Sequence, residues 1–251
     1  MSASPTEPYY DWIFHYKLSR AISCKESFDD PTIKLTKDSN NNLQGFDITI
    51  KNESESNARK TSEKRANNLQ RILIIMSGMA LNAHQTSHEA VPKTPGLKKV
   101  GKTIISGYDI EGAIDKVDLT DPIIARSITQ DENPSLEYLS NASVHKNQGR
   151  FSDSIREAFR ILEGNKSIKD YCKFKCIRNI LSHKEGVPLH KDTMNDFIQY
   201  FDPNVHDIFD FKQYDLKNSI IILDNESNKT KHALGQIARD LISQAKSIVG
   251  L

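Results

Sequence analysis

The sequence predicts an α+β protein with two domains: a mixed α/β domain over residues 1–130 and an all-α helical bundle over residues 131–251. Two observations carry this prediction. The first half alternates strand-like runs with one long helical stretch. From Asn133-Pro134 onward, apolar residues recur at three- and four-residue steps, which is the spacing of amphipathic helices packed around a common core.

The composition limits the possible functions. The chain has 251 residues, 37% of them hydrophobic and 27% charged, as expected for a folded protein. Its 34 basic and 33 acidic residues give a net charge of +1, so any contact with nucleic acid must be local. The longest apolar run, residues 72–76, is far below the roughly 20 residues that cross a bilayer, so we expect no membrane partner. Three cysteines and the lack of a signal-peptide pattern predict a cytoplasmic location.

Strands and one helix are predicted in the first half. Residues 14–24 and 46–51 have strand character, the second with strict alternation of apolar and polar residues. The polar stretch between them predicts a loop or a hairpin tip. Residues 54–85 predict one long helix, with Ser54 or Ser56 as its N-cap. Short strand-like runs return at residues 103–105 and 110–119.

Helices are predicted throughout the second half. A helix from Pro134 ends before Gly149, and further helices are expected over residues 151–163, 168–184, 192–201 and 227–249. Between the last two, the apolar run at residues 220–223 predicts a lone strand or a buried turn.

Residues 176–183, CIRNILSH, carry the most specific chemical pattern. Histidine titrates near neutral pH, so His183 is a candidate general acid or base. Arg178 can stabilise charge on a phosphoryl group, and Asn179 can orient it. Positions five apart on an ideal helix differ by about 140°, so the two side chains converge only if the long arginine reaches round the helix, if the helix distorts near Gly186, or if a two-fold dimer brings two such pairs into one cleft. A composite site across a dimer is favoured. Alternatively, Arg178 pairs with Glu157, Glu163 or Asp170, while His183 and Lys184 interact with the negative end of the helix dipole.

This Arg-Asn-Ile-Leu-Ser-His run inside a helical bundle resembles the HEPN superfamily over residues 134–250. The resemblance implies a HEPN-like bundle and metal-independent cleavage of RNA by a homodimer in defence or stress response. It implies no cofactor and no metal. Arg178 and His183 would be catalytic, with Asn179 in support, and Lys175 and Lys184 are expected to contact RNA. Many HEPN-like domains are instead non-catalytic dimerisation modules. Residues 1–130 resemble no family, and we expect them to sense a ligand or to position substrate.

Two further pairs could bind a metal. His84 and His88 have the spacing of two zinc ligands on one helix face, but a solvated helix end is favoured. Cys172 and Cys176 are favoured as buried small side chains, although a redox role or a metal site with His183 stays open.

Residues 96–103 match the phosphate-loop pattern Gly-x4-Gly-Lys-Thr. That loop needs a strand before it and a helix after it, whereas prolines precede this match and a strand-like run follows it. A nucleotide-hydrolysing protein is therefore the less favoured alternative. The nearby lysines, Lys93, Lys98, Lys99 and Lys102, either contact phosphate or form a solvated loop.

Overall fold

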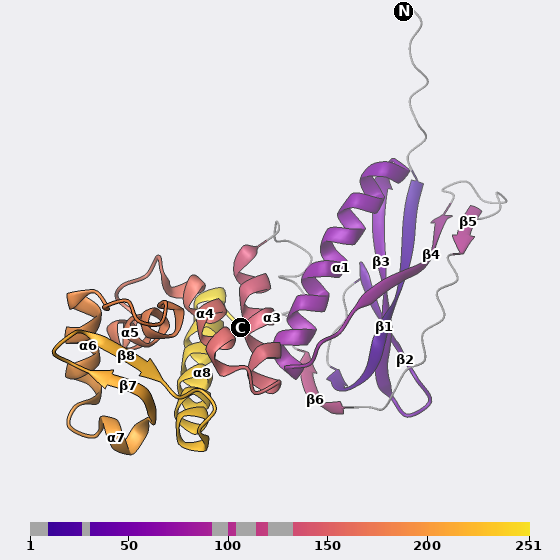
Figure 1. The fold of residues 1–251 in the computed structure, drawn as a ribbon. Coiled ribbons are helices and arrows are strands. Elements are labelled where there is room, and N and C mark those ends of the chain that lie inside the picture. The colour runs from indigo at the N-terminus through magenta and orange to yellow at the C-terminus, as the bar shows by residue number, and fades with distance from the viewer. Residues whose placement is uncertain (1–9, 27–30, 92–99, 104–113, 120–132) are drawn as a thin grey trace, which may run out of the picture. The chain divides into compact units, whose positions relative to one another are not determined.

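The computed structural model describes residues 10–26, 31–91, 100–103, 114–119 and 133–251 (Figure 1). The chain divides into two compact units, Met1–Asn133 and Pro134–Leu251. In the described residues, a mostly antiparallel sheet and one helix form the first unit, and helices dominate the second, which confirms the α+β class. The division lies three residues beyond the predicted boundary at residue 130.

The first unit is built around a long central strand. β1 pairs with β3 on one side and β4 on the other, and the sheet order is β2-β3-β1-β4-β5. β6 pairs in parallel with the last part of β1. The strands are β1 (Tyr10–Glu26), β2 (Ile33–Lys37), β3 (Asn42–Glu53), β4 (Ala83–Val91), β5 (Val100–Thr103) and β6 (Ile114–Leu119).

Helix α1 (Glu55–Ser77) covers one face of this sheet (Figure 1). Alternate residues of β1, from Trp12 to Leu18, are buried on that face, where α1 contributes Leu69, Ile72 and Leu73. The Ser54 hydroxyl accepts a hydrogen bond from the Asn57 amide and caps the helix, as predicted.

The predicted extension of this helix to residue 85 is wrong. Gly78 adopts the left-handed conformation, with φ of 68°, and its amide donates to the Ile74 carbonyl. This C-cap ends α1 at Ser77. Residues 83–91 then pair with β1 as strand β4, so the expected helix end at His84 and His88 is a strand instead.

The Tyr16 hydroxyl provides a test of the packing between α1 and the sheet. It lies 2.8 Å from the Ser62 hydroxyl of α1, and burial raises the pKa of the Tyr16 phenol from 10.0 to about 12. Between pH 10 and 12 the folded state therefore holds a proton that the unfolded state loses, so stability falls as the pH rises. Denaturant titrations at pH 9 and 11.5 measure the decrease in the free energy of unfolding between these two pH values. We expect this decrease to be roughly 2 kcal/mol smaller in Tyr16→Phe than in wild type.

A tyrosine of the second unit supplies the control for that measurement. Tyr138 is half-buried beside Arg160, and in Tyr138→Phe the contact of Tyr16 with Ser62 is intact, so the part of the alkaline loss that Tyr16 causes should remain. An equal alkaline loss in wild type and Tyr16→Phe would contradict the assignment of this effect to Tyr16.

The second unit packs its helices around α4 and α8. α4 contacts α3, α5 and α8, and its buried face includes Ile155, Ala158, Phe159 and Leu162, as the sequence periodicity predicts. The helices are α3 (Pro134–Asn147), α4 (Phe151–Leu162), α5 (Tyr171–Ser182), α6 (Lys191–Phe201), α7 (Val205–Ile208) and α8 (Asn228–Val249).

This unit also holds a β-hairpin that the all-α prediction does not include. The apolar run expected as a lone strand or buried turn is β8 (Ile220–Leu223), and it pairs antiparallel with β7 (Phe211–Asp215). The hairpin lies against the end of α5. Among the described helices of the chain, none is long and apolar enough to cross a membrane.

Candidate functional site in the helical unit

The end of α5 positions the Arg178–His183 motif. Ile177, Ile180 and Leu181 are buried and anchor the last two turns of the helix in the core. Arg178 lies within α5, whereas His183 is its C-cap residue and has an extended backbone, with φ of −79° and ψ of 144°. The helix therefore ends between the two residues, and their side chains do not follow the 140° relation of an ideal helix.

Arg178 is held by side chains of α4 and α5. It forms an ion pair with Glu163, and its Nη1 donates to Asn179 Oδ1 at 3.1 Å. Its guanidinium carbon lies 4.8 Å above the centre of the Phe159 ring. Of the three acidic partners considered from the sequence, Glu163 is the one that binds Arg178. Asn179 in turn donates through Nδ2 to Thr193 Oγ1 at 3.0 Å.

His183 is oriented by main-chain carbonyls. Its Nε2 lies 2.9 Å from the Val187 oxygen and 3.1 Å from the Pro188 oxygen. Because carbonyl oxygens only accept hydrogen bonds, Nε2 carries the hydrogen. In the neutral ring, Nδ1 is then the nitrogen with the lone pair. Within one chain, the described contacts of Arg178 and His183 share no residue, so the structure does not bring the two side chains together.

The surroundings of His183 include two residues that sequence reasoning missed. A small pocket of about 120 Å³ has a polar lining of His183, Lys184 and Glu185 just beyond α5, Lys212 of β7 and Asn225. Lys184 is exposed, whereas Lys175 is half-buried on α5 and does not line this pocket. No local signal in the sequence could have placed Lys212 here, because the hairpin that carries it lies about 30 residues beyond the motif.

A third residue missed from the sequence is Arg156 of α4. Its guanidinium donates to the Leu181 carbonyl, to Ser182 Oγ at 3.3 Å and to Asp153 Oδ1 at 3.1 Å. A cation therefore lies at the C-terminal end of α5, where helix carbonyls lack partners within the helix. This is the role that the alternative interpretation gave to His183 and Lys184.

The histidine pair of the first unit does not form a metal site. His84 and His88 lie on strand β4, where four residues span roughly 13 Å. His88 pairs with Phe14 of β1, and His84 pairs with Lys17. These two partners are three residues apart, an odd number, because the pairing contains a bulge. The two histidines therefore lie on opposite faces of the sheet. Two ligands of one zinc ion need to lie within about 4 Å of each other.

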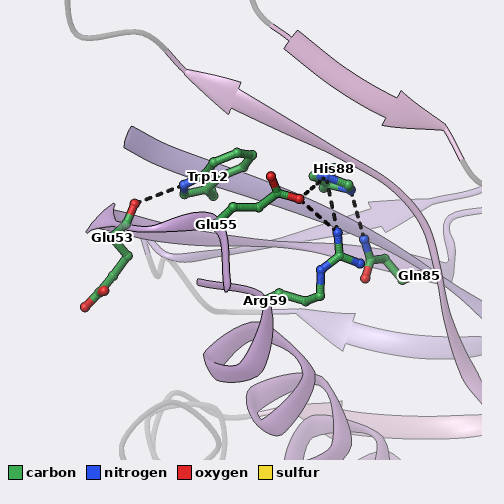
Figure 2. A network of polar contacts seen from close by, with 6 residues as sticks. All are labelled: Trp12, Glu53, Glu55, Arg59, Gln85 and His88. Carbon is green, nitrogen blue, oxygen red and sulfur yellow. Dashed lines mark hydrogen bonds and ion pairs between the residues drawn. The ribbon is translucent and has the colours of Figure 1, made fainter. Parts of the chain in front are cut away.

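His88 is instead buried within a polar network at the edge of the sheet unit's core (Figure 2). Glu55 Oε1 lies 3.3 Å from Nε2, and Gln85 Nε2 lies 3.3 Å from Nδ1. The ring also stacks on Phe14, with 5.7 Å between ring centroids. Arg59 donates to the same Glu55 oxygen at 3.1 Å. Both ring nitrogens of His88 therefore face protein groups, which indicates a structural role at the start of α1.

The remaining sequence motifs have plain structural positions. Cys176 is buried, and burial raises the pKa of its thiol, which agrees with a small core side chain and not with a reactive one.

Gly101, Lys102 and Thr103 lie in strand β5, paired with β4, whereas a phosphate loop requires them at the start of a helix. Residues 96–99 and the lysines at 93, 98 and 99 lie outside the described residues. No group of three potential metal ligands occurs within the described ranges.

Comparison of the chain with protein-family models, curated proteins and solved structures finds no match. The functional argument therefore depends on the geometry of the sites themselves.

Proposed function

We propose that the helical unit is a HEPN-type, metal-independent endoribonuclease that acts as a homodimer. The observation that supports this proposal best is the orientation of His183. Two main-chain carbonyls fix its ring through Nε2, at a pocket that also presents Lys184 and Lys212. The remaining nitrogen, Nδ1, is available for proton transfer next to side chains that attract phosphate.

The reaction requires two proton transfers and one charged intermediate. The 2′-oxygen of RNA loses its proton and bonds to the adjacent phosphorus, and the bond from phosphorus to the 5′-oxygen breaks. That 5′-oxygen gains a proton, so the products are a 2′,3′-cyclic phosphate and a 5′-hydroxyl. In this proposal His183 carries out one proton transfer, and Arg178 stabilises the negative charge on the phosphoryl oxygens.

A second copy of the chain would complete the site. Arg178 and His183 of one chain have separate partners, and one imidazole cannot take up and deliver both protons at the same moment. In a two-fold dimer, the motifs at the ends of the two α5 helices face each other, which supplies a second histidine and a second arginine. The ion pair of Arg178 with Glu163 is partly exposed on both sides, at 31% and 49%, so exchange of Glu163 for a phosphate costs little.

The second candidate is a dimerisation module without catalysis. The contacts of Arg178 favour it, because an ion pair, a hydrogen bond and a stacked ring together describe a structural arginine. For either function we propose a cytoplasmic role in defence or stress response. The cysteines favour that compartment, since Cys24, Cys172 and Cys176 form no disulfide in the described parts of the chain.

Cleavage of single-stranded RNA by the full chain, in excess chelator, tests the proposal. We expect wild type to produce 2′,3′-cyclic phosphate ends, and His183→Ala to lower the rate about 100-fold or more, because the proton-transfer group is lost. His232→Ala is the matched control, since His232 is exposed on α8 and does not line the His183 pocket.

The control should cleave at the wild-type rate. Equal rates for His183→Ala and wild type would refute catalysis by His183. A wild-type chain that forms dimers without cleaving any RNA would favour the dimerisation module.

A further inference from the structure

We propose that the sheet unit binds a phosphate ester of about mononucleotide size, through His15 and Lys17 on the sheet face opposite α1. This site is independent of the proposed ribonuclease site, and it assigns a role to the sheet unit.

The sheet face opposite α1 is polar where the face under α1 is apolar. On β1, Trp12, Phe14 and Tyr16 are buried under α1, so the residues between them point to the opposite face. His15 and Lys17 are two of these residues. The neighbouring strands add Asp47 and Gly45 of β3, which pair with His15 and Lys17, and Lys34 and Thr36 of β2, which pair with Asp47 and Gly45.

His15 and Asp47 form an oriented pair on this face. His15 Nδ1 donates to Asp47 Oδ1 at 2.8 Å, and the two side chains are 32% and 25% exposed. The carboxylate fixes the orientation of the ring, as in the histidine–aspartate pairs of hydrolases. Nε2 is left to form a hydrogen bond with a bound group.

A glycine opens a pocket beside this pair. A Cβ at position 45 would lie 2.3 Å from the Tyr16 carbonyl oxygen, so only glycine fits, and its lack of a side chain leaves space over the middle of the sheet. The resulting pocket has a volume of about 410 Å³, which is within the range of small-ligand sites. Its other lining residues are polar, namely Lys17, Thr36, Gln44 and Thr86 besides His15 and Asp47.

The charges around the pocket favour an anionic ligand. Lys17 has no acidic partner among the described residues, and exposed Lys34 lies opposite Asp47 in the neighbouring strand. The two lysines outnumber the one carboxylate, that of Asp47. The donors also approach from different strands, with an ammonium from β1 and a hydroxyl of Thr36 from β2. A tetrahedral phosphate accepts hydrogen bonds from several directions, and the volume leaves space for the group that it esterifies.

Calorimetric titration of the full chain with adenosine monophosphate and with inorganic phosphate tests the site. We expect both to bind, the nucleotide more tightly, and both Lys17→Ala and His15→Gln to weaken binding at least tenfold. Lys60→Ala is the matched control, because Lys60 is exposed on α1, which covers the other face. Thermal unfolding of each variant verifies that the sheet unit is folded.

Two further titrations identify the source of the phosphate. An oligonucleotide with a 5′-phosphate that binds more tightly than both the monophosphate and its 5′-hydroxyl counterpart would assign the site to RNA ends. Tighter binding of the monophosphate would assign it to free nucleotides. Absence of binding by both phosphate probes at millimolar concentration, or equal binding by Lys17→Ala and wild type, would overturn the proposal. Because the readout is binding, it is separate from the cleavage assay of His183.

Discussion

Arg178→Ala is expected to lower the rate of chelator-resistant RNA cleavage by about 10²–10³, the usual effect of removing one group that stabilises transition-state charge. Glu163→Gln should instead strengthen RNA binding, because the Glu163 carboxylate is bound to the guanidinium group that would bind a phosphate. We expect Glu163→Gln to bind RNA more tightly than wild type, by a few-fold, since the ion pair is partly exposed. Single-turnover cleavage rates and RNA affinities of the two variants provide the measurement.

The two expected results, slower cleavage by Arg178→Ala and tighter RNA binding by Glu163→Gln, distinguish a catalytic arginine from a structural one. If Arg178 only connects α4 to α5, both substitutions break the same contact, and both should lower stability slightly without raising RNA affinity. Arg239→Ala is the matched control, because Arg239 is exposed on α8 and bonds only to Gln236 in the described contacts. Cleavage by Arg178→Ala at the wild-type rate would contradict the proposed chemistry.

Gly45→Ala should destabilise the sheet unit by about 3–4 kcal/mol. The added Cβ would lie 2.3 Å from the Tyr16 carbonyl oxygen, and this oxygen belongs to the central strand β1, which β3 and β4 hold on both sides. Neither backbone can move without breaking strand pairs, so no small adjustment relieves the contact. Urea unfolding, followed with hydrogen exchange of peptides from β1 and β3, measures the loss.

Gly164→Ala provides the comparison. A Cβ at position 164 would meet no atom within 4 Å, so we expect a change within about 0.5 kcal/mol. Equal stability of Gly45→Ala and wild type would contradict the close approach of β3 to β1. It would also remove the steric basis of the proposed phosphate pocket.

The longer helices were readable from the sequence, because each depends on local periodicity and end signals. The buried face of α4 and the cap of α1 at Ser54 are examples. The error at residues 78–91 has a physical cause. Gly78 was a visible stop signal, but His, Gln and Ser residues give β4 little strand preference of their own, and pairing with β1 determines its conformation.

The class, the helical second half and the arginine and histidine near one helix end follow from sequence pattern. The contacts of those side chains depend on how distant elements pack. Packing of α4 on α5 selected Glu163 among three acidic candidates, and the β7–β8 hairpin brought Lys212 to the His183 pocket. His15 and Asp47 are 32 residues apart, and the register of β1 with β3 alone makes them neighbours. Periodicity reports which face of an element is buried, whereas contacts between distant residues depend on packing and register, which no local pattern encodes.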